Sequence, residues 1–168
     1  MTAFGVNAIV MPPGFDGFLH YHERQDELYF VHRGRARVEV EGEVRELGDG
    51  PGFRKVRRAL GVTAFGVNAI VFPPGFEGFE HFHERQDELY FVHRGRARVE
   101  VGGETRELGE GGLLHVESTT PRKVSNASTD EDLVLLVVGG KDGYVERDGQ
   151  LVDPERDLER RAAFGRDG

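Results

Sequence analysis

Two histidines separated by one residue, His81 and His83, have the spacing of a metal-binding pair. Side chains alternate between the two faces of an extended strand, so both imidazoles would project from the same side of a sheet. Four polar residues that suit a turn follow, then Glu88, and residues 89–92 (LYFV) read as the next strand. The carboxylate of Glu88 would therefore return across a hairpin. Two imidazole nitrogens and one hard oxygen donor are ligands that a divalent transition metal accepts.

The same arrangement occurs twice in the chain. Residues 2–48 align with residues 63–109 without a gap, and only six of the 47 positions differ. The first copy repeats the ligand-type residues as His20, His22 and Glu27. A solenoid requires three or more stacked units of shorter period, so this is a partial duplication. We expect the first trio to be a duplicate and incomplete site.

The spacing in the second copy resembles the first signature motif of the cupin superfamily at every required position. The motif runs from Gly75 over five residues to His81 and His83, over four more to Glu88, and over six more to Gly95. The resemblance implies an all-β fold, a cupin-type jelly-roll β-barrel with this trio as its metal ligands. It also implies oxygenase or sugar-isomerase chemistry, although a fold does not fix a reaction.

Cupins of this kind usually carry a second motif, whose histidine stands four residues before an asparagine and completes the metal site. The asparagine is Asn126 in this chain, and Arg122 stands at the position of the histidine. Arginine offers no lone pair, so Arg122 cannot be a ligand. It would either hold a substrate carboxylate or phosphate by a forked hydrogen bond, or point outward in a barrel that has lost its metal.

Two further residues are candidates for the site. His115 would be a fourth ligand if its strand turns it inward, and is otherwise an ordinary strand histidine. Tyr90 shares the face of Glu88, so it would either donate its hydroxyl into the cavity or pack in the core. Without a fourth ligand, two histidines and one carboxylate leave coordination positions open, as in non-haem Fe(II) sites. Manganese, nickel and zinc would also accept these ligands.

The segments that follow each copy decide the predicted architecture. The second copy continues into more apolar segments, including residues 133–138 (LVLLVV), which are apolar on both faces and predict a buried strand. We therefore predict a complete barrel over residues 51–140. Residues 1–50 would be a partial duplicate of its N-terminal half, adding extra strands to this barrel or to that of a partner. A homodimer, with or without strand exchange, is the expected assembly.

Residues 141–168 are predicted to form a hairpin and a short C-terminal helix. Asp148 and Gly149 are a dipeptide favoured in tight hairpin turns. The helix would begin at Pro154, with Asp153 as its N-cap residue.

Composition argues against a nucleic acid or a membrane as the partner, and the expected partner is a small-molecule ligand. The chain has 168 residues, of which 38% are hydrophobic, no cysteine and a formal net charge of −8. The negative charge disfavours nucleic acids, whose binding depends on many Lys and Arg contacts. The absence of cysteine favours a cytoplasmic location. The apolar run at the N-terminus is too short to span a membrane and has no basic residues before it.

Three functions are consistent with the sequence. The first is a metal-dependent enzyme, an oxygenase or isomerase, that acts on a small oxygen-bearing molecule. The second is a barrel that binds a small ligand without catalysis. The third is a metal-free barrel that serves in assembly. Metal content separates the third from the others, and turnover separates the first from the second.

Overall fold

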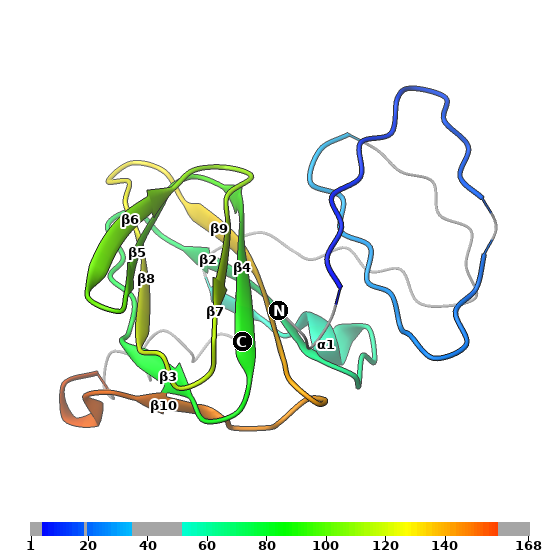
Figure 1. Ribbon diagram of the computed structural model, residues 1–168. Coiled ribbons are helices and arrows are strands. Elements are labelled where there is room, and N and C mark those ends of the chain that lie inside the picture. Colours follow the sequence, from blue (N-terminus) through cyan, green and yellow to red (C-terminus); the bar gives the residue numbers. More distant parts are fainter. Residues whose placement is uncertain (1–4, 19, 35–51, 158–168) are drawn as a thin grey trace.

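The computed structural model describes residues 5–18, 20–34 and 52–157, and these contain two antiparallel five-stranded sheets (Figure 1). The first sheet has the strand order β1-β2-β9-β4-β7, and the second has the order β10-β3-β8-β5-β6. In chain order the elements are β1 (Gly52–Arg54), α1 (Val56–Ala59), β2 (Gly66–Phe72), β3 (His81–His83), β4 (Asp87–Arg94), β5 (Ala97–Val101), β6 (Glu104–Leu108), β7 (Leu113–Val116), β8 (Arg122–Asn126), β9 (Leu133–Gly140) and β10 (Gly149–Leu151).

The hydrophobic core lies between the two sheets and draws residues from six strands. This arrangement confirms the predicted all-β fold, because the strands of both sheets turn alternate apolar residues inward. The buried cluster consists of Ile70, Phe72, Tyr90, Val92, Ala97, Val99, Val116, Val124, Leu133, Leu135 and Val137.

The apolar strand β9 lies at the centre of the first sheet, between β2 and β4. Leu133, Leu135 and Val137 are buried in the core, whereas the residues that alternate with them are half-buried on the outside. The prediction that this strand is buried on both faces was therefore wrong. An antiparallel sheet packs one face on the core and leaves the other outside, and here that outer face is apolar too.

Two glycines of the sequence motif occupy backbone positions that other residues would strain. Gly75 has a φ of +68° and Gly95 a φ of +86°, in the left-handed region that glycine adopts without a steric penalty. A Cβ atom at Gly95 would also lie 2.5 Å from the carbonyl oxygen of Asp132. Gly75 therefore lies in the turn that follows β2, and Gly95 lies between β4 and β5.

The first copy does not add strands to the barrel in its described part. Residues 5–18 and 20–34 form neither helix nor strand, and Figure 1 shows them as a loop beside the barrel. The expectation of extra N-terminal strands is wrong for these residues, and residues 35–50 lie outside the described part of the chain.

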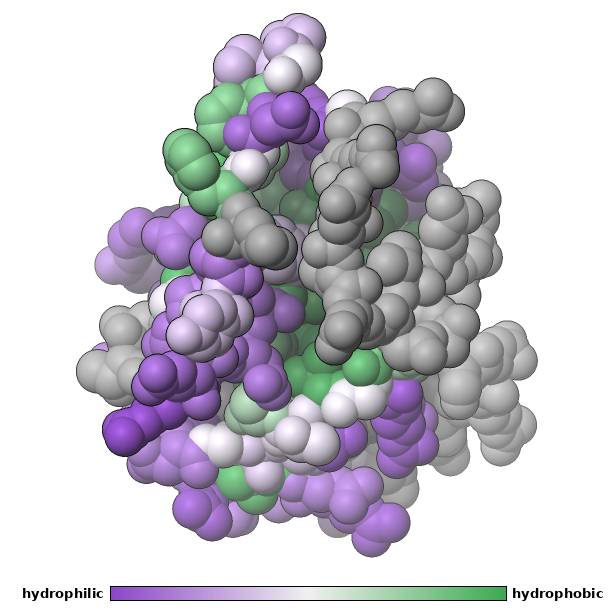
Figure 2. All heavy atoms as spheres, turned by 90° about the vertical axis from the view of Figure 1, so that its right-hand side faces the viewer, coloured by the Kyte–Doolittle hydropathy of each residue, from purple (hydrophilic) through white to green (hydrophobic). Residues whose placement is uncertain are grey.

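Burial shows why one sequence takes two structures. Val67 and Tyr90 of the second copy are 0% and 5% exposed, whereas the equivalent Val6 and Tyr29 of the first copy are 47% and 54% exposed. The second copy is covered by β7, β8 and β9, which pair with its strands. Two strands alone are marginally stable without such partners. Apolar residues of the first copy consequently lie on the surface, and Figure 2 shows the molecule from the side on which this copy lies.

The C-terminal part differs from the predicted hairpin. Residues 144–147 form no strand, and β10 pairs instead with β3 and forms the edge of the second sheet. The predicted helix does begin at Pro154, and Asp153 caps it by accepting a hydrogen bond from the Arg156 N–H at 3.1 Å. The helix is described as far as Asp157. No helix in the described ranges has the length and apolarity that a membrane crossing requires.

Candidate metal centre

Strands β3 and β4 bring the three predicted ligands together. Nε2 of His83 lies 3.2 Å from Oε1 of Glu88, and Nε2 of His81 lies 3.6 Å from Oε2 of the same carboxylate. One donor atom from each residue lies within 4.8 Å of the other two. The predicted hairpin does not form, because β3 and β4 lie in different sheets. The two histidines project from the same side of β3, and Glu88 reaches them from β4 of the other sheet.

The donor atoms fit one metal ion. Zinc binds imidazole nitrogen and carboxylate oxygen at about 2.0 to 2.2 Å, so donors around one ion lie roughly 3 to 3.5 Å apart. Nδ1 of His81 is 3.1 Å from the carbonyl oxygen of Phe79. Because a carbonyl can only accept, Nδ1 carries a hydrogen, and in the neutral imidazole Nε2 is then the nitrogen that can bind a metal.

Asp148 is a carboxylate behind His83 that the sequence analysis assigned only to a turn. Its Oδ2 lies 3.5 Å from Nδ1 of His83 and accepts hydrogen bonds from the Arg85 and Gln86 N–H groups at 3.1 and 2.8 Å. The Gln86 side chain in turn forms two hydrogen bonds with the backbone of Val145. Nδ1 of His83 has no hydrogen-bond partner among the described residues, so Asp148 acts on the imidazole as a nearby negative charge. A carboxylate beside the far nitrogen of a ligating histidine favours the tautomer that carries its hydrogen there. No local sequence signal links Asp148 to the site.

Gly149 lets β10 approach the site closely. It is paired with His83 in the sheet, and a Cβ atom at position 149 would lie 3.2 Å from Cε1 of the imidazole. Any larger residue would therefore push against the His83 ring.

Arg122 points into the barrel. It is 0% exposed, it lies opposite His81 in the pairing of β3 with β8, and its Nε is 3.5 Å from Oε2 of Glu88. The alternative that Arg122 points outward was therefore wrong. Its Nη2 donates a hydrogen bond to the carbonyl of Glu117 at 3.4 Å. Within the described ranges, Nε and Nη1 have no hydrogen-bond partner.

Tyr90 and the histidines hold Glu88 as a carboxylate. The buried Tyr90 hydroxyl donates a hydrogen bond to Oε2 of Glu88 at 2.5 Å. Burial, and then the charge of Glu88, raise the pKa of Tyr90 well above its usual value, so Tyr90 stays a donor. Burial alone would raise the pKa of Glu88, but hydrogen bonds with His81 and His83 outweigh it and hold this pKa well below its usual range.

His115 does not join the site. It lies opposite Leu89 in the pairing of β4 with β7, so it faces away from Glu88. Its Nε2 is 3.8 Å from Oδ2 of Asp87, which also forms an ion pair with Lys141. The expectation of a fourth ligand at His115 was therefore wrong, because strand alternation turns its side chain to the other face.

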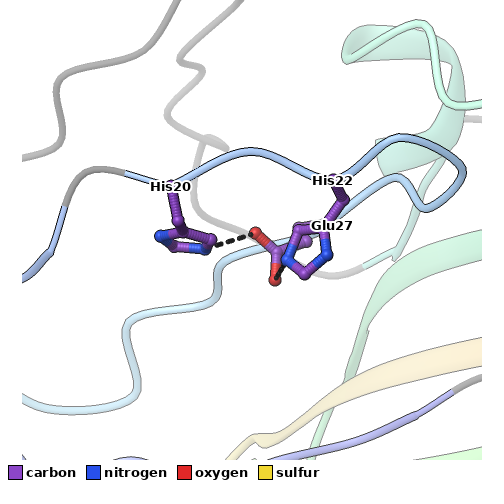
Figure 3. Close-up of side chains that lie close together, drawn as sticks. All are labelled: His20, His22 and Glu27. Carbon is purple, nitrogen blue, oxygen red and sulfur yellow. Dashed lines mark ion pairs between the residues drawn. The ribbon is translucent and has the colours of Figure 1, made fainter.

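The first copy reproduces the ligand trio at the surface (Figure 3). Nε2 of His20 and Nε2 of His22 lie 3.3 and 3.1 Å from the carboxylate of Glu27, which accepts a hydrogen bond from Tyr29. The side chains are 53%, 38% and 41% exposed, whereas those of His81, His83 and Glu88 are 27%, 15% and 12% exposed. Among the residues that the structure describes, Glu27 is the only ion-pair partner of His22. In that part of the chain, this trio has no counterpart of Asp148.

Comparison with known proteins identifies the family. The model of the cupin domain family matches residues 8–54 and 69–139, which together make up more than half of the chain. An uncharacterized protein of Streptomyces coelicolor is 43% identical over 53 residues, which are 32% of this chain and 49% of that protein. The chain thus spans about half the length of the curated relative it matches.

A solved structure shows the same fold. A cupin protein from Bacteroides fragilis has a TM-score of 0.54 and 22% identity, and the match covers 61% of this chain and 86% of that chain. The DMSP lyase DddQ from Ruegeria pomeroyi has a TM-score of 0.48 and 26% identity over 55% of this chain and 45% of its own. A cupin-superfamily sugar phosphate isomerase from Silicibacter pomeroyi has a TM-score of 0.48 and 26% identity, and the match covers 52% of this chain and 57% of that chain.

The family match and the two packed sheets confirm the predicted jelly-roll barrel. This chain belongs to the cupin family.

Proposed function

We propose that this cupin binds one divalent transition-metal ion through Nε2 of His81, Nε2 of His83 and the carboxylate of Glu88. The observation that carries the proposal is the convergence of these three donors within 4.8 Å. Two further observations support it. The imidazole of His81 is oriented by a backbone carbonyl, and the low pKa of Glu88 keeps its carboxylate charged at neutral pH.

We further propose that the site takes a small oxygen-bearing molecule with a carboxylate or phosphate group. Two histidines and one carboxylate leave coordination positions for such a ligand. A bound metal would supply Lewis-acid or oxygen-activating chemistry. Arg122 would bind the anionic group, because a buried cation with unsatisfied N–H groups gains charge-assisted hydrogen bonds from it. The imidazoles are the most exposed part of the site, so the molecule would enter from their side.

An oxygenase or isomerase of small metabolites is the enzyme activity that fits these residues. Tyr90 would hold Glu88 in place during the reaction, since its hydroxyl is already bonded to that carboxylate. Asp148 would keep a negative charge beside His83.

A second function is favoured by the position of Arg122. A guanidinium 3.5 Å from Glu88 balances the buried negative charge without a metal. A barrel stabilised in this way would bind a small anion without catalysis, or would serve only in assembly.

Calorimetric titration of the full chain with Mn²⁺, Fe²⁺, Ni²⁺ and Zn²⁺ tests the metal proposal. We expect saturation at one ion per chain. His81→Ala should weaken metal binding by more than about 100-fold. This exceeds the loss of affinity caused by substituting residues that only support the metal ligands. His20→Ala, the equivalent substitution in the first copy, is the matched control and should bind like the wild type. Equal binding by both variants would contradict the proposal.

Turnover separates the enzyme from the binding protein. The metal-loaded chain would be given hydroxy acids, phenols and sugar phosphates while oxygen consumption and product formation are followed. Activity that disappears in His81→Ala and persists in His20→Ala supports catalysis at this site. Metal and ligand binding without turnover supports the non-catalytic alternative.

A further inference from the structure

Four aromatic side chains, two from each copy, pack together on the outer face of β4. The Phe30 ring lies 5.7 Å from the ring of Phe91 and 5.2 Å from that of His93, measured between centroids. The His32 ring lies 5.1 Å from each of the same two rings. Nδ1 of His32 and Nδ1 of His93 are 3.0 Å apart, so one imidazole donates a hydrogen bond to the other.

These contacts join equivalent positions of the duplication. Phe30 corresponds to Phe91 and His32 to His93. The five-residue segments that contain them, residues 29–33 and 90–94, have the same sequence. Each residue therefore contacts its own counterpart, and each also contacts the counterpart of the other. This reciprocal pattern is that of an isologous interface, in which a surface meets an identical surface across a two-fold axis.

The outer face of the sheet extends beyond the contact with the first copy. Phe91 is paired with Leu113 of β7 and with Leu136 of β9, and directly opposed residues in an antiparallel sheet project from the same face. Leu113 is 50% exposed. The three side chains form an apolar row across β7, β4 and β9, and we call it, together with His93, the β4 face.

A charged contact at the edge of the β4 face follows the same symmetry. Nε of Arg33 donates a hydrogen bond to Glu110 at 3.1 Å. The counterpart of Arg33 in the barrel is Arg94, whose side chain is 65% exposed and lies 4.0 Å from Asp132. If two β4 faces met, Arg94 of each chain would take the place of Arg33 beside Glu110 of the other chain.

We propose that the β4 face is a self-complementary surface for a second copy of this chain, and that the first copy occupies this surface within the same chain. The occupant in the structure identifies the partner, because residues 29–33 have the same sequence as residues 90–94 of the face that they cover. The first copy and a second chain would both contact Phe91 and His93, so they cannot occupy the β4 face at the same time. Release of the first copy therefore creates a dimer, and this inference is independent of the metal site.

Sedimentation velocity of the full chain over a range of concentrations tests the proposal. The release variant is Phe30→Ser with Arg33→Ser. The homodimer expected from the sequence is thereby assigned to the form in which the first copy is released. We expect the wild type to be monomeric and the release variant to form a concentration-dependent dimer. The control is Val10→Ser with Phe18→Ser, which changes first-copy side chains that are 95% and 86% exposed. A monomeric release variant, or a control that dimerises equally, would overturn the proposal.

Variants of the barrel show whether any dimer uses the β4 face. Phe91→Ser in the release variant should restore the monomer. Arg94→Glu in the release variant should weaken the dimer, and Arg94→Glu with Glu110→Arg should restore it, because the charged pair is re-formed with reversed sign. A dimer that persists with Phe91→Ser uses another surface and contradicts the proposal.

A milder variant tests the proposal in case the release variant misfolds. Arg33→Glu alters only one side chain, which is 74% exposed, and places a carboxylate against Glu110. It should raise the dimer fraction above that of the wild type, and circular dichroism would verify that the sheets are intact. An unchanged monomer in this folded variant also counts against the proposal.

Discussion

The Asp148 carboxylate lies beside His83 and holds the turn before β4. Oδ2 of Asp148 lies 3.5 Å from Nδ1 of His83 and accepts hydrogen bonds from the N–H groups of Arg85 and Gln86. The side chain of Asp148 is 2% exposed, so solvent screens these interactions little. The segment that leads into β10 thus places a negative charge behind one proposed metal ligand.

Asp148→Asn is expected to weaken metal binding by about 10- to 100-fold, as the loss of an outer-shell partner typically does. The amide oxygen still accepts one backbone hydrogen bond, but the negative charge behind His83 is lost. Competition with a chromophoric chelator measures the affinity. Asp153→Asn is the control, because asparagine also caps a helix and Asp153 lies in the same segment. Equal affinities of the two variants would show that Asp148 does not act on the metal site.

Gly149→Ala is expected to displace the imidazole of His83 and to lower metal affinity. The added methyl group would lie 3.2 Å from Cε1, closer than van der Waals contact allows, so the ring must shift by a few tenths of an ångström. The same titration measures the effect. Gly109→Ala serves as the control, because its added methyl group meets nothing within 4 Å. If Gly149→Ala bound metal as tightly as Gly109→Ala, the close approach of β10 would have no bearing on the ligand.

Arg122→Met is expected to destabilise the metal-free chain by about 3 to 5 kcal/mol, because it leaves Glu88 as an uncompensated buried charge. A bound metal restores the positive charge, so adding metal should recover much of the loss. Urea unfolding with and without metal measures both free energies. Arg106→Met, at a side chain that is 75% exposed, should change stability by no more than about 0.5 kcal/mol. A loss of the same size with and without metal would argue against a metal beside Glu88.

The contact between the two copies is expected to weaken in acid. Burial, and then the charges of His32 and Arg94, lower the pKa of His93 below its usual 6.5, whereas Glu110 acts in the opposite direction. A histidine with a lowered pKa stabilises the folded contact above pH 6.5, and this stabilisation is lost as the pH falls through the lowered value. Two protonated imidazoles would also repel each other.

Titration of the His93 imidazole by NMR measures this shift. The midpoint should lie below 6.5 in the wild type and move upward in Phe30→Ser with Arg33→Ser, because release of the first copy removes burial and the charge of His32. An identical midpoint in both chains would show that the first copy does not cover His93 in solution.

Local sequence pattern predicted the ligand trio, and also Tyr90 and Arg122 beside it, but not Asp148. His81, His83 and Glu88 lie within eight residues, so strand alternation and one turn fix their relation. Asp148 is 65 positions after His83 and reaches it through the pairing of β10 with β3. The predicted hairpin turn at Asp148 and Gly149 is wrong, because the turn lies at residues 146–147 and Gly149 begins β10. The free edge of β3, which the sequence does not reveal, determines the strand with which the following residues pair.

The duplication shows which features the local sequence determines and which depend on tertiary contacts. Nearly identical sequence forms strands in the second copy and none in the described part of the first. Strand preference reflects packing against neighbours more than an intrinsic property of the backbone. Ile70 is 6% exposed beneath the opposing sheet, whereas its counterpart Ile9 is 66% exposed. The geometry of the first trio nevertheless recurs, because ion pairs between His20, His22 and Glu27 require only local contacts.

Elemental analysis of the purified full chain, loaded with each metal and freed of excess, measures directly whether His81, His83 and Glu88 hold a metal ion. We expect one ion per chain for the wild type and for His20→Ala with His22→Ala, and none for His81→Ala with His83→Ala. A wild type that retains no metal, or a His81→Ala with His83→Ala variant that keeps its ion, would contradict the proposed metal site.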